Sequence, residues 1–161
     1  YKMLMNPVEI AYLLAPAASG YAASMVCGVD GENAGDCIPW RPPGYVFGIV
    51  WPILYLLIGV SMIFASRIVT SPMAVFTYSC LIILLAMWPI IYTCYNNKMG
   101  GVVIILASIV TAAMAFIQGD LQSRITLAPL ILWLCFALAL NVTEITSTEC
   151  TQTEVDDSIS N

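Results

Sequence analysis

The side chains of this sequence best suited to specific contacts are aromatic, and no set of acid–base groups accompanies them. The 161 residues include four tryptophans and eight tyrosines but no histidine, which excludes acid–base chemistry and metal sites that depend on an imidazole. The sequence places no nucleophile beside a base, and it has no phosphate-binding loop and no cluster of metal ligands at a suitable spacing. We therefore expect a binding protein and not an enzyme, with no catalytic residue, no metal site and no required cofactor.

Two sets of residues repeat every four positions, which places each set on one face of a helix. The sets are Phe47, Trp51 and Tyr55, and then Trp133, Ala137 and Asn141. An indole ring well inside a helix of a bundle must pack between helices or line a cavity, where its N–H group needs a partner. Two aromatic faces separated by small residues would form a flat slot for a planar ring system, although core packing alone also explains such stripes.

The composition indicates a membrane protein. Sixty per cent of the residues are hydrophobic and 9% are charged, with a mean hydropathy of +0.89, whereas a soluble domain carries roughly 25% charged residues. Only 5 residues are Lys or Arg, and the net charge is -5. A basic nucleic-acid-binding protein is therefore excluded.

Five uncharged stretches predict five transmembrane helices, because each is near the roughly 20 residues needed to cross a bilayer. Their expected cores are residues 10–26, 45–65, 74–95, 102–117 and 126–142. None of them shows the alternation of polar and apolar residues that strands of a membrane barrel would have. We expect an all-α polytopic membrane bundle over residues 1–143, followed by an acidic polar tail over residues 144–161 whose composition is typical of disorder.

The expected connectors are short, except for residues 27–43. Short connectors make successive helices antiparallel neighbours, and a long connector on a compact bundle favours a lid or a docking segment. A Cys27–Cys37 disulfide would staple this connector if it faced an oxidising compartment. The first helix is rich in small residues between Ala15 and Ser24, which allows close packing either within the bundle or in a dimer.

Three segments resemble the TspO/translocator-protein family, also known as tryptophan-rich sensory proteins or peripheral benzodiazepine receptors. Residues 40–55, WRPPGYVFGIVWPILY, resemble the start of the family's second helix. Tyr78 and Trp88 stand ten positions apart in the third span, as the family's Tyr and Trp do. The fifth span has the similar pattern P-x-x-x-W-x-x-F-A-x-x-x-N over residues 129–141. With Pro16 and Gly20 in the first span, the resemblance covers roughly residues 16–141.

The resemblance implies a TspO/MBR-like bundle of five helices that acts as a membrane receptor or transporter. Its ligand would be planar and apolar, with porphyrin or haem as the first candidate and a sterol or other lipid as the second. The family also implies a homodimer surrounded by membrane lipids, in a mitochondrial or other organellar membrane or in a bacterial-type inner membrane, with the long loop facing a reducing cytosol. The expected ligand-binding residues are Tyr45, Phe47, Trp51, Tyr55, Trp88, Trp133, Ala137 and Asn141.

Several positions depart from the family pattern. Leu81 and Leu85 occupy third-helix positions where the family usually has Gln and Asn, and Leu130 replaces the tyrosine after the fifth-helix proline. No Tyr, Lys or Arg follows Arg124, so the cholesterol motif of animal members is absent, which weakens the sterol interpretation. Leu81 and Leu85, together with a first loop that lacks the family's Trp-Tyr dipeptide, leave an alternative function open, that of an accessory structural subunit of a larger membrane complex.

Overall fold

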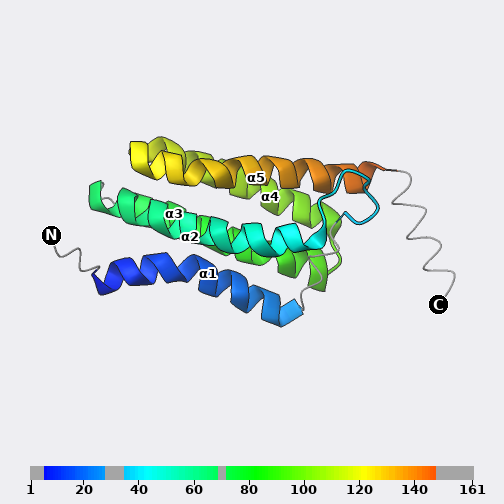
Figure 1. Ribbon diagram of the computed structural model, residues 1–161, viewed down its shortest axis with the longest axis horizontal. Coiled ribbons are helices and arrows are strands. Elements are labelled where there is room, and N and C mark those ends of the chain that lie inside the picture. The colour runs from blue at the N-terminus through cyan, green and yellow to red at the C-terminus, as the bar shows by residue number, and fades with distance from the viewer. Residues whose placement is uncertain (1–5, 28–34, 69–71, 148–161) are drawn as a thin grey trace.

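Five long helices make up the computed structural model, which describes residues 6–27, 35–68 and 72–147 (Figure 1). They are α1 (Pro7–Cys27), α2 (Gly44–Ile68), α3 (Pro72–Pro89), α4 (Lys98–Gln118) and α5 (Leu121–Thr146). A short π-helix, η2 (Ile90–Cys94), continues α3 beyond Pro89. No β-strand occurs in the described ranges. The predicted all-α bundle of five helices is confirmed.

Four of the helices are long and apolar enough to cross a membrane. They cover Gly44–Arg67, Pro72–Cys94, Lys98–Gln118 and Leu121–Thr146. Helix α1 does not reach this standard among the described residues, because its apolar side chains are interrupted by Ser, Gly, Pro and Glu9. Large apolar side chains point outward from α3, α4 and α5, among them Phe76, Val110 and Leu132. Surfaces of this kind suit lipid and not water.

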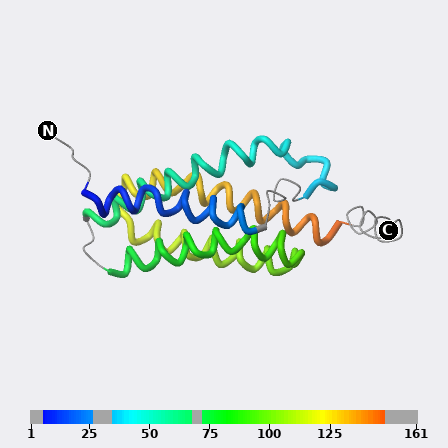
Figure 2. The backbone as a smooth tube through the Cα atoms, turned by 90° about the horizontal axis from the view of Figure 1, so that it is seen from below, coloured from blue at the N-terminus to red at the C-terminus, as the bar shows by residue number. Residues whose placement is uncertain are grey.

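The helices form a ring in the order α1, α2, α5, α4, α3. Helix α1 packs between α2 and α3, and α5 packs between α2 and α4. Figure 2 shows α2 and α3 on opposite sides of α1. This order brings α2 and α5, the two helices with the predicted aromatic stripes, directly together.

Helices α1 and α2 approach closely at two glycines. A Cβ atom added at Gly59 would lie 2.7 Å from Cα and 2.8 Å from the carbonyl oxygen of Leu13. One added at Gly20 would overlap the ring of Tyr55. At Gly20, therefore, the small residues of α1 serve packing within the bundle, and the predicted homodimer stays a prediction.

Replacing Gly59 with alanine is expected to lower the thermal unfolding temperature in detergent. The added methyl group meets the backbone of α1 at Leu13, so the two helices must separate, and overpacking of this kind typically costs about 1–3 kcal/mol. Gly48→Ala is the matched control, because a Cβ atom there meets nothing within 4 Å. Equal unfolding temperatures for the two variants would contradict the close approach.

A cluster of hydroxyl groups joins α2, α3 and α5. The Ser61 Oγ atom lies 2.6 Å from the Tyr78 hydroxyl oxygen and 2.9 Å from Ser123 Oγ, and the Tyr78 hydroxyl lies 2.9 Å from Ser123 Oγ. Ser61 also donates to the carbonyl oxygen of Ser123 at 2.9 Å. All three side chains are buried. Tyr78, one of the residues that carry the family resemblance, therefore has a structural role here.

The turns before and after α4 are shorter than the expected helix cores implied. A capping residue precedes each of α4 and α5, and both helices begin before their expected cores, which started at residues 102 and 126. The Asn97 side chain accepts from the N–H of Gly100 at 2.8 Å at the start of α4. The Asp120 side chain accepts from the N–H of Ser123 at 3.0 Å at the start of α5. At the end of the bundle where α1 and α5 begin, the Glu9 carboxylate accepts from Arg67 Nε at 2.7 Å, and this hydrogen bond holds the pKa of Glu9 below its usual value.

The cysteine side chains that the structure describes are of two kinds. Cys37 and Cys94 are each disulfide-bonded, whereas Cys80 and Cys135 are free thiols within α3 and α5. The side chain of Cys27 lies outside the described residues, so a Cys27–Cys37 bridge stays a prediction. Within the described ranges, no group of His, Cys, Asp or Glu side chains is arranged to hold a metal ion.

Candidate ligand-binding site

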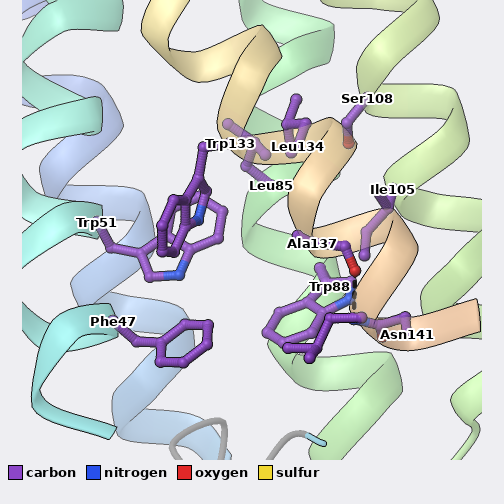
Figure 3. Close-up of a pocket in the computed structure, with 11 residues that line it drawn as sticks. Phe47, Trp51, Leu85, Trp88, Ile105, Ser108, Trp133, Leu134, Ala137 and Asn141 are labelled. Atoms are coloured by element: carbon purple, nitrogen blue, oxygen red, sulfur yellow. Dashed lines mark hydrogen bonds between the residues drawn. The ribbon is translucent and has the colours of Figure 1, made fainter. Parts of the chain in front are cut away.

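A small buried cavity lies between α2, α3, α4 and α5, toward the end of the bundle where the long connector lies (Figure 3). Its volume is about 20 Å³, and a single water molecule needs about 10–15 Å³. The cavity is lined by Phe47, Trp51, Leu85, Trp88, Ile105, Ser108, Trp133, Leu134, Ala137, Leu140 and Asn141. The two predicted aromatic faces thus meet at one cavity.

Aromatic rings in contact form the walls. Phe47 from α2 and Trp133 from α5 meet edge to face, with ring centroids 5.6 Å apart. Trp88 from α3 stacks on Tyr92 at 5.0 Å, with 18° between the ring planes. Figure 3 shows the rings of Phe47, Trp51 and Trp133 on one side of the cavity and the ring of Trp88 on the other. In this conformation the slot is closed to any ligand larger than one or two atoms.

Two of the expected ligand-binding residues lie elsewhere. Tyr45 is 69% exposed on the outer face of α2, because it is two positions before Phe47 and a helix turns through about 200° over two residues. The ring of Tyr55 contacts that of Trp51, with centroids 5.7 Å apart and 30° between the planes, but extends toward Gly20 of α1 and away from the cavity. The other predicted residues, Phe47, Trp51, Trp88, Trp133, Ala137 and Asn141, all line it.

Four aliphatic residues and Ser108 complete the lining, and no sequence pattern predicted them as site residues. Leu85 and Ile105 come from α3 and α4, and Leu134 and Leu140 come from α5. In a chain this apolar, the sequence pattern around a leucine that faces a cavity is the same as that around a leucine that faces lipid. Only Leu85 carried a signal, because it occupies a position that is usually polar in the resembling family. Its leucine side chain makes that part of the cavity apolar.

Three polar atoms at the cavity are buried without a hydrogen-bond partner in the described part of the chain: Nε1 of Trp88, Nε1 of Trp133 and Oδ1 of Asn141. The Asn141 Nδ2 atom, by contrast, donates to the carbonyl oxygen of Ala137 at 2.9 Å (dashed in Figure 3). Buried polar groups are nearly always hydrogen-bonded, because leaving one unpaired costs about 1–3 kcal/mol. Two donors and one acceptor are therefore available to a bound molecule.

Comparison with known proteins places the chain among its relatives. The family model described as "TspO/MBR family" matches residues 12–145. The chain belongs to the TspO/MBR family. It is 29% identical over 139 residues to "Tryptophan-rich protein TspO" of Archaeoglobus fulgidus, and the match spans 82% of this chain and 91% of the relative. Family membership and four apolar helices identify this TspO/MBR protein as an integral membrane protein.

The described part of the long connector packs against residues that line the cavity in this TspO/MBR protein. Ile38, which is 4% exposed, forms an apolar cluster with Phe47 and Leu140, and Trp51 and Trp133 pack against it. The guanidinium carbon of Arg41 lies 5.1 Å from the ring centroid of Phe47. Residues of the connector therefore contact the same rings that form the cavity walls, and its role as a lid stays a prediction.

A buried carboxylate lies near the same end of the bundle. The Tyr92 hydroxyl lies 2.7 Å and 2.6 Å from the two carboxylate oxygens of Glu144 and donates its proton to them, and Lys98 Nζ lies 3.4 Å from Oε1. Glu144 is only 6% exposed. The expected start of the tail at residue 144 is thus wrong for this residue, since α5 continues to Thr146. A single glutamate after an uncharged stretch gave no sign in the sequence that it would be buried and paired.

Proposed function

We propose that this TspO/MBR protein is a membrane receptor or transporter that binds a planar apolar ligand, such as a porphyrin, between α2 and α5. One observation carries the proposal: indole rings from both helices, Trp51 and Trp133, border a buried cavity in which the N–H group of Trp133 has no partner among the described residues. Indole faces bind flat ring systems by stacking, and indole N–H groups bind acceptor atoms. Packing alone would leave no reason for an unpaired donor.

Binding requires the cavity to open. A porphyrin is far larger than the present volume of about 20 Å³, so the structure corresponds to the closed member of a two-state equilibrium. A ligand must displace two sets of contacts. One is the contact between Phe47 and Trp133, and the other is the packing of Ile38 in its apolar cluster. An aromatic pair contributes only about 0.5–1.5 kcal/mol beyond its buried area. Burying a large flat ligand between the same rings can offset that loss.

A titration with protoporphyrin IX in lipid nanodiscs tests the proposal. We expect saturable quenching of the tryptophan fluorescence at one porphyrin per chain, with Trp51 and Trp133 in contact with the ligand. Quenching that rises in proportion to the porphyrin concentration, without saturation, would indicate partition into lipid and would contradict the proposal. Stoichiometric co-purification with other membrane subunits, without saturable quenching, would favour the accessory role instead.

A further inference from the structure

Two polar atoms that border the cavity lie close to Gly101 of α4, and we call the place formed by Gly101, Trp88 and Asn141 the polar notch. The position that a Cβ atom would take at Gly101 lies 3.4 Å from Trp88 Nε1 and 3.6 Å from Asn141 Oδ1. Both of these atoms are buried, and both lack a hydrogen-bond partner in the described ranges. One donor and one acceptor therefore lie within contact distance of the same position, where residue 101 itself places no side-chain atom because it is glycine.

The acceptor in this notch has a fixed identity. Asn141 Nδ2 donates to the carbonyl oxygen of Ala137 at 2.9 Å. If the amide were flipped, its oxygen would face the carbonyl oxygen of Ala137, and two acceptors would oppose each other. The amide oxygen must therefore face the notch, where it can only accept a hydrogen bond, while the Trp88 indole can only donate one.

These two atoms favour a particular kind of chemical group. A hydroxyl group or a cyclic amide can accept from Trp88 and donate to Asn141 at the same time. An ether or ketone oxygen would leave Asn141 Oδ1 unpaired. A carboxylate would place a negative charge against Asn141 Oδ1 in a cavity whose other lining side chains are mostly apolar, such as Leu85 and Ile105, which is costly.

We propose that the notch formed by Gly101, Trp88 and Asn141 selects flat apolar ligands that carry one neutral group able both to accept and to donate a hydrogen bond, a hydroxyl or a cyclic amide. The proposal rests on the proposed function, since it describes the selectivity of the same cavity. Trp51 and Trp133 would hold the ring system, and the notch would fix its orientation through that neutral group. A charged substituent, such as a propionate of protoporphyrin IX, would lie outside the notch.

Two matched probes test this selectivity, 1-pyrenemethanol and its methyl ether, which share a flat ring system and differ in one donor. Their dissociation constants are measured by tryptophan-to-pyrene energy transfer in nanodiscs, and only the saturable part is counted. We expect the alcohol to bind about tenfold more tightly than the ether, as one added hydrogen bond in a buried site gives. 1-Pyrenecarboxylate is expected to bind more weakly than the alcohol.

Gly101→Ala is the decisive variant, because its methyl group occupies the notch and leaves Trp88 and Asn141 in place. The Cβ atom comes within 3.0 Å of Tyr92 Cδ2, so that side chain must shift by a few tenths of an ångström. We expect the alcohol-to-ether preference to fall to about onefold in Gly101→Ala and to stay near tenfold in Gly48→Ala, a substitution with open space around it. If Gly101→Ala does not fold, Trp88→Phe removes the donor instead and should also abolish the preference.

The outcomes separate the two proposals. Equal affinities for alcohol and ether in the unmodified protein overturn the notch and leave the proposed function standing. A preference that survives both Gly101→Ala and Trp88→Phe also overturns the notch. Absence of saturable binding by either pyrene overturns it as well, and a protoporphyrin IX titration of the same sample then decides whether the proposed function falls with it.

Discussion

Replacing both Trp51 and Trp133 with alanine is expected to weaken protoporphyrin IX binding by about a thousandfold. Each indole borders the cavity from a different helix, and a buried aromatic residue at the centre of a binding site typically contributes at least 2 kcal/mol. Two such losses add to about 4 kcal/mol, which corresponds to that factor. Binding is measured from the shift of the porphyrin absorption band, because the substitutions remove two of the fluorophores.

The controls for this experiment separate lost contacts from lost fold. Trp40→Ala removes a tryptophan that packs on Phe136 at 6.0 Å and does not line the cavity, so its porphyrin affinity should stay within about twofold. The double variant Trp51→Phe and Trp133→Phe keeps a flat ring at both positions, so it should bind porphyrin more tightly than the double alanine variant. If the double alanine variant bound porphyrin as tightly as the unmodified protein, with the same unfolding temperature and helicity, the proposal that porphyrin binds at this cavity would be contradicted.

Tyr92→Phe is expected to destabilise the protein by about 3 kcal/mol, the second large effect. The Tyr92 hydroxyl contacts both carboxylate oxygens of Glu144, and Lys98 Nζ lies 3.4 Å from one of them. Removing a partner of a buried charge typically costs about 3–5 kcal/mol, because the charge stays behind without compensation. Lys98 offsets part of this cost. The measurement is the thermal unfolding temperature, or the inactivation half-life where unfolding is irreversible.

A second substitution in the same pair reports the origin of that loss. Adding Glu144→Gln to Tyr92→Phe removes the uncompensated charge, so the double variant should be more stable than Tyr92→Phe alone. If Tyr92→Phe destabilised the protein only by removing packing contacts of the hydroxyl oxygen, the charge of Glu144 would not matter. The losses of stability from Tyr92→Phe and Glu144→Gln would then simply add. Additive losses would therefore contradict a role for the buried carboxylate.

Much of this architecture follows from the sequence because apolar stretches and helical spacing are local signals. Uncharged runs located all five helices, and four-residue spacing brought Phe47 and Trp51 to the same wall as expected. Trp133, Ala137 and Asn141 lie together on α5 for the same reason. Motifs in the segments that form α2 and α5 then indicated the TspO/translocator-protein family, and the match to the TspO/MBR family model confirms that resemblance.

The remaining features depend on contacts between helices that no local pattern encodes. Tyr55 shares a helix face with Trp51, yet the close approach of Gly20 draws its ring to α1. From the sequence, Glu144 was expected to be the first residue of the tail. In the structure it is buried because the hydroxyl of Tyr92, from η2, donates a hydrogen bond to it. Gly101 matters only through the atoms that face it from α3 and α5. Each case needed the ring order of the helices, which residue spacing does not give.

An experimental structure of the protein with protoporphyrin IX bound in lipid nanodiscs tests the central claim most directly. The claim predicts the macrocycle between Trp51 and Trp133, with the rings of Phe47 and Trp133 farther apart than the 5.6 Å of the closed cavity. A macrocycle resting on the lipid-facing surface, with that contact intact and the cavity still near 20 Å³, would contradict it.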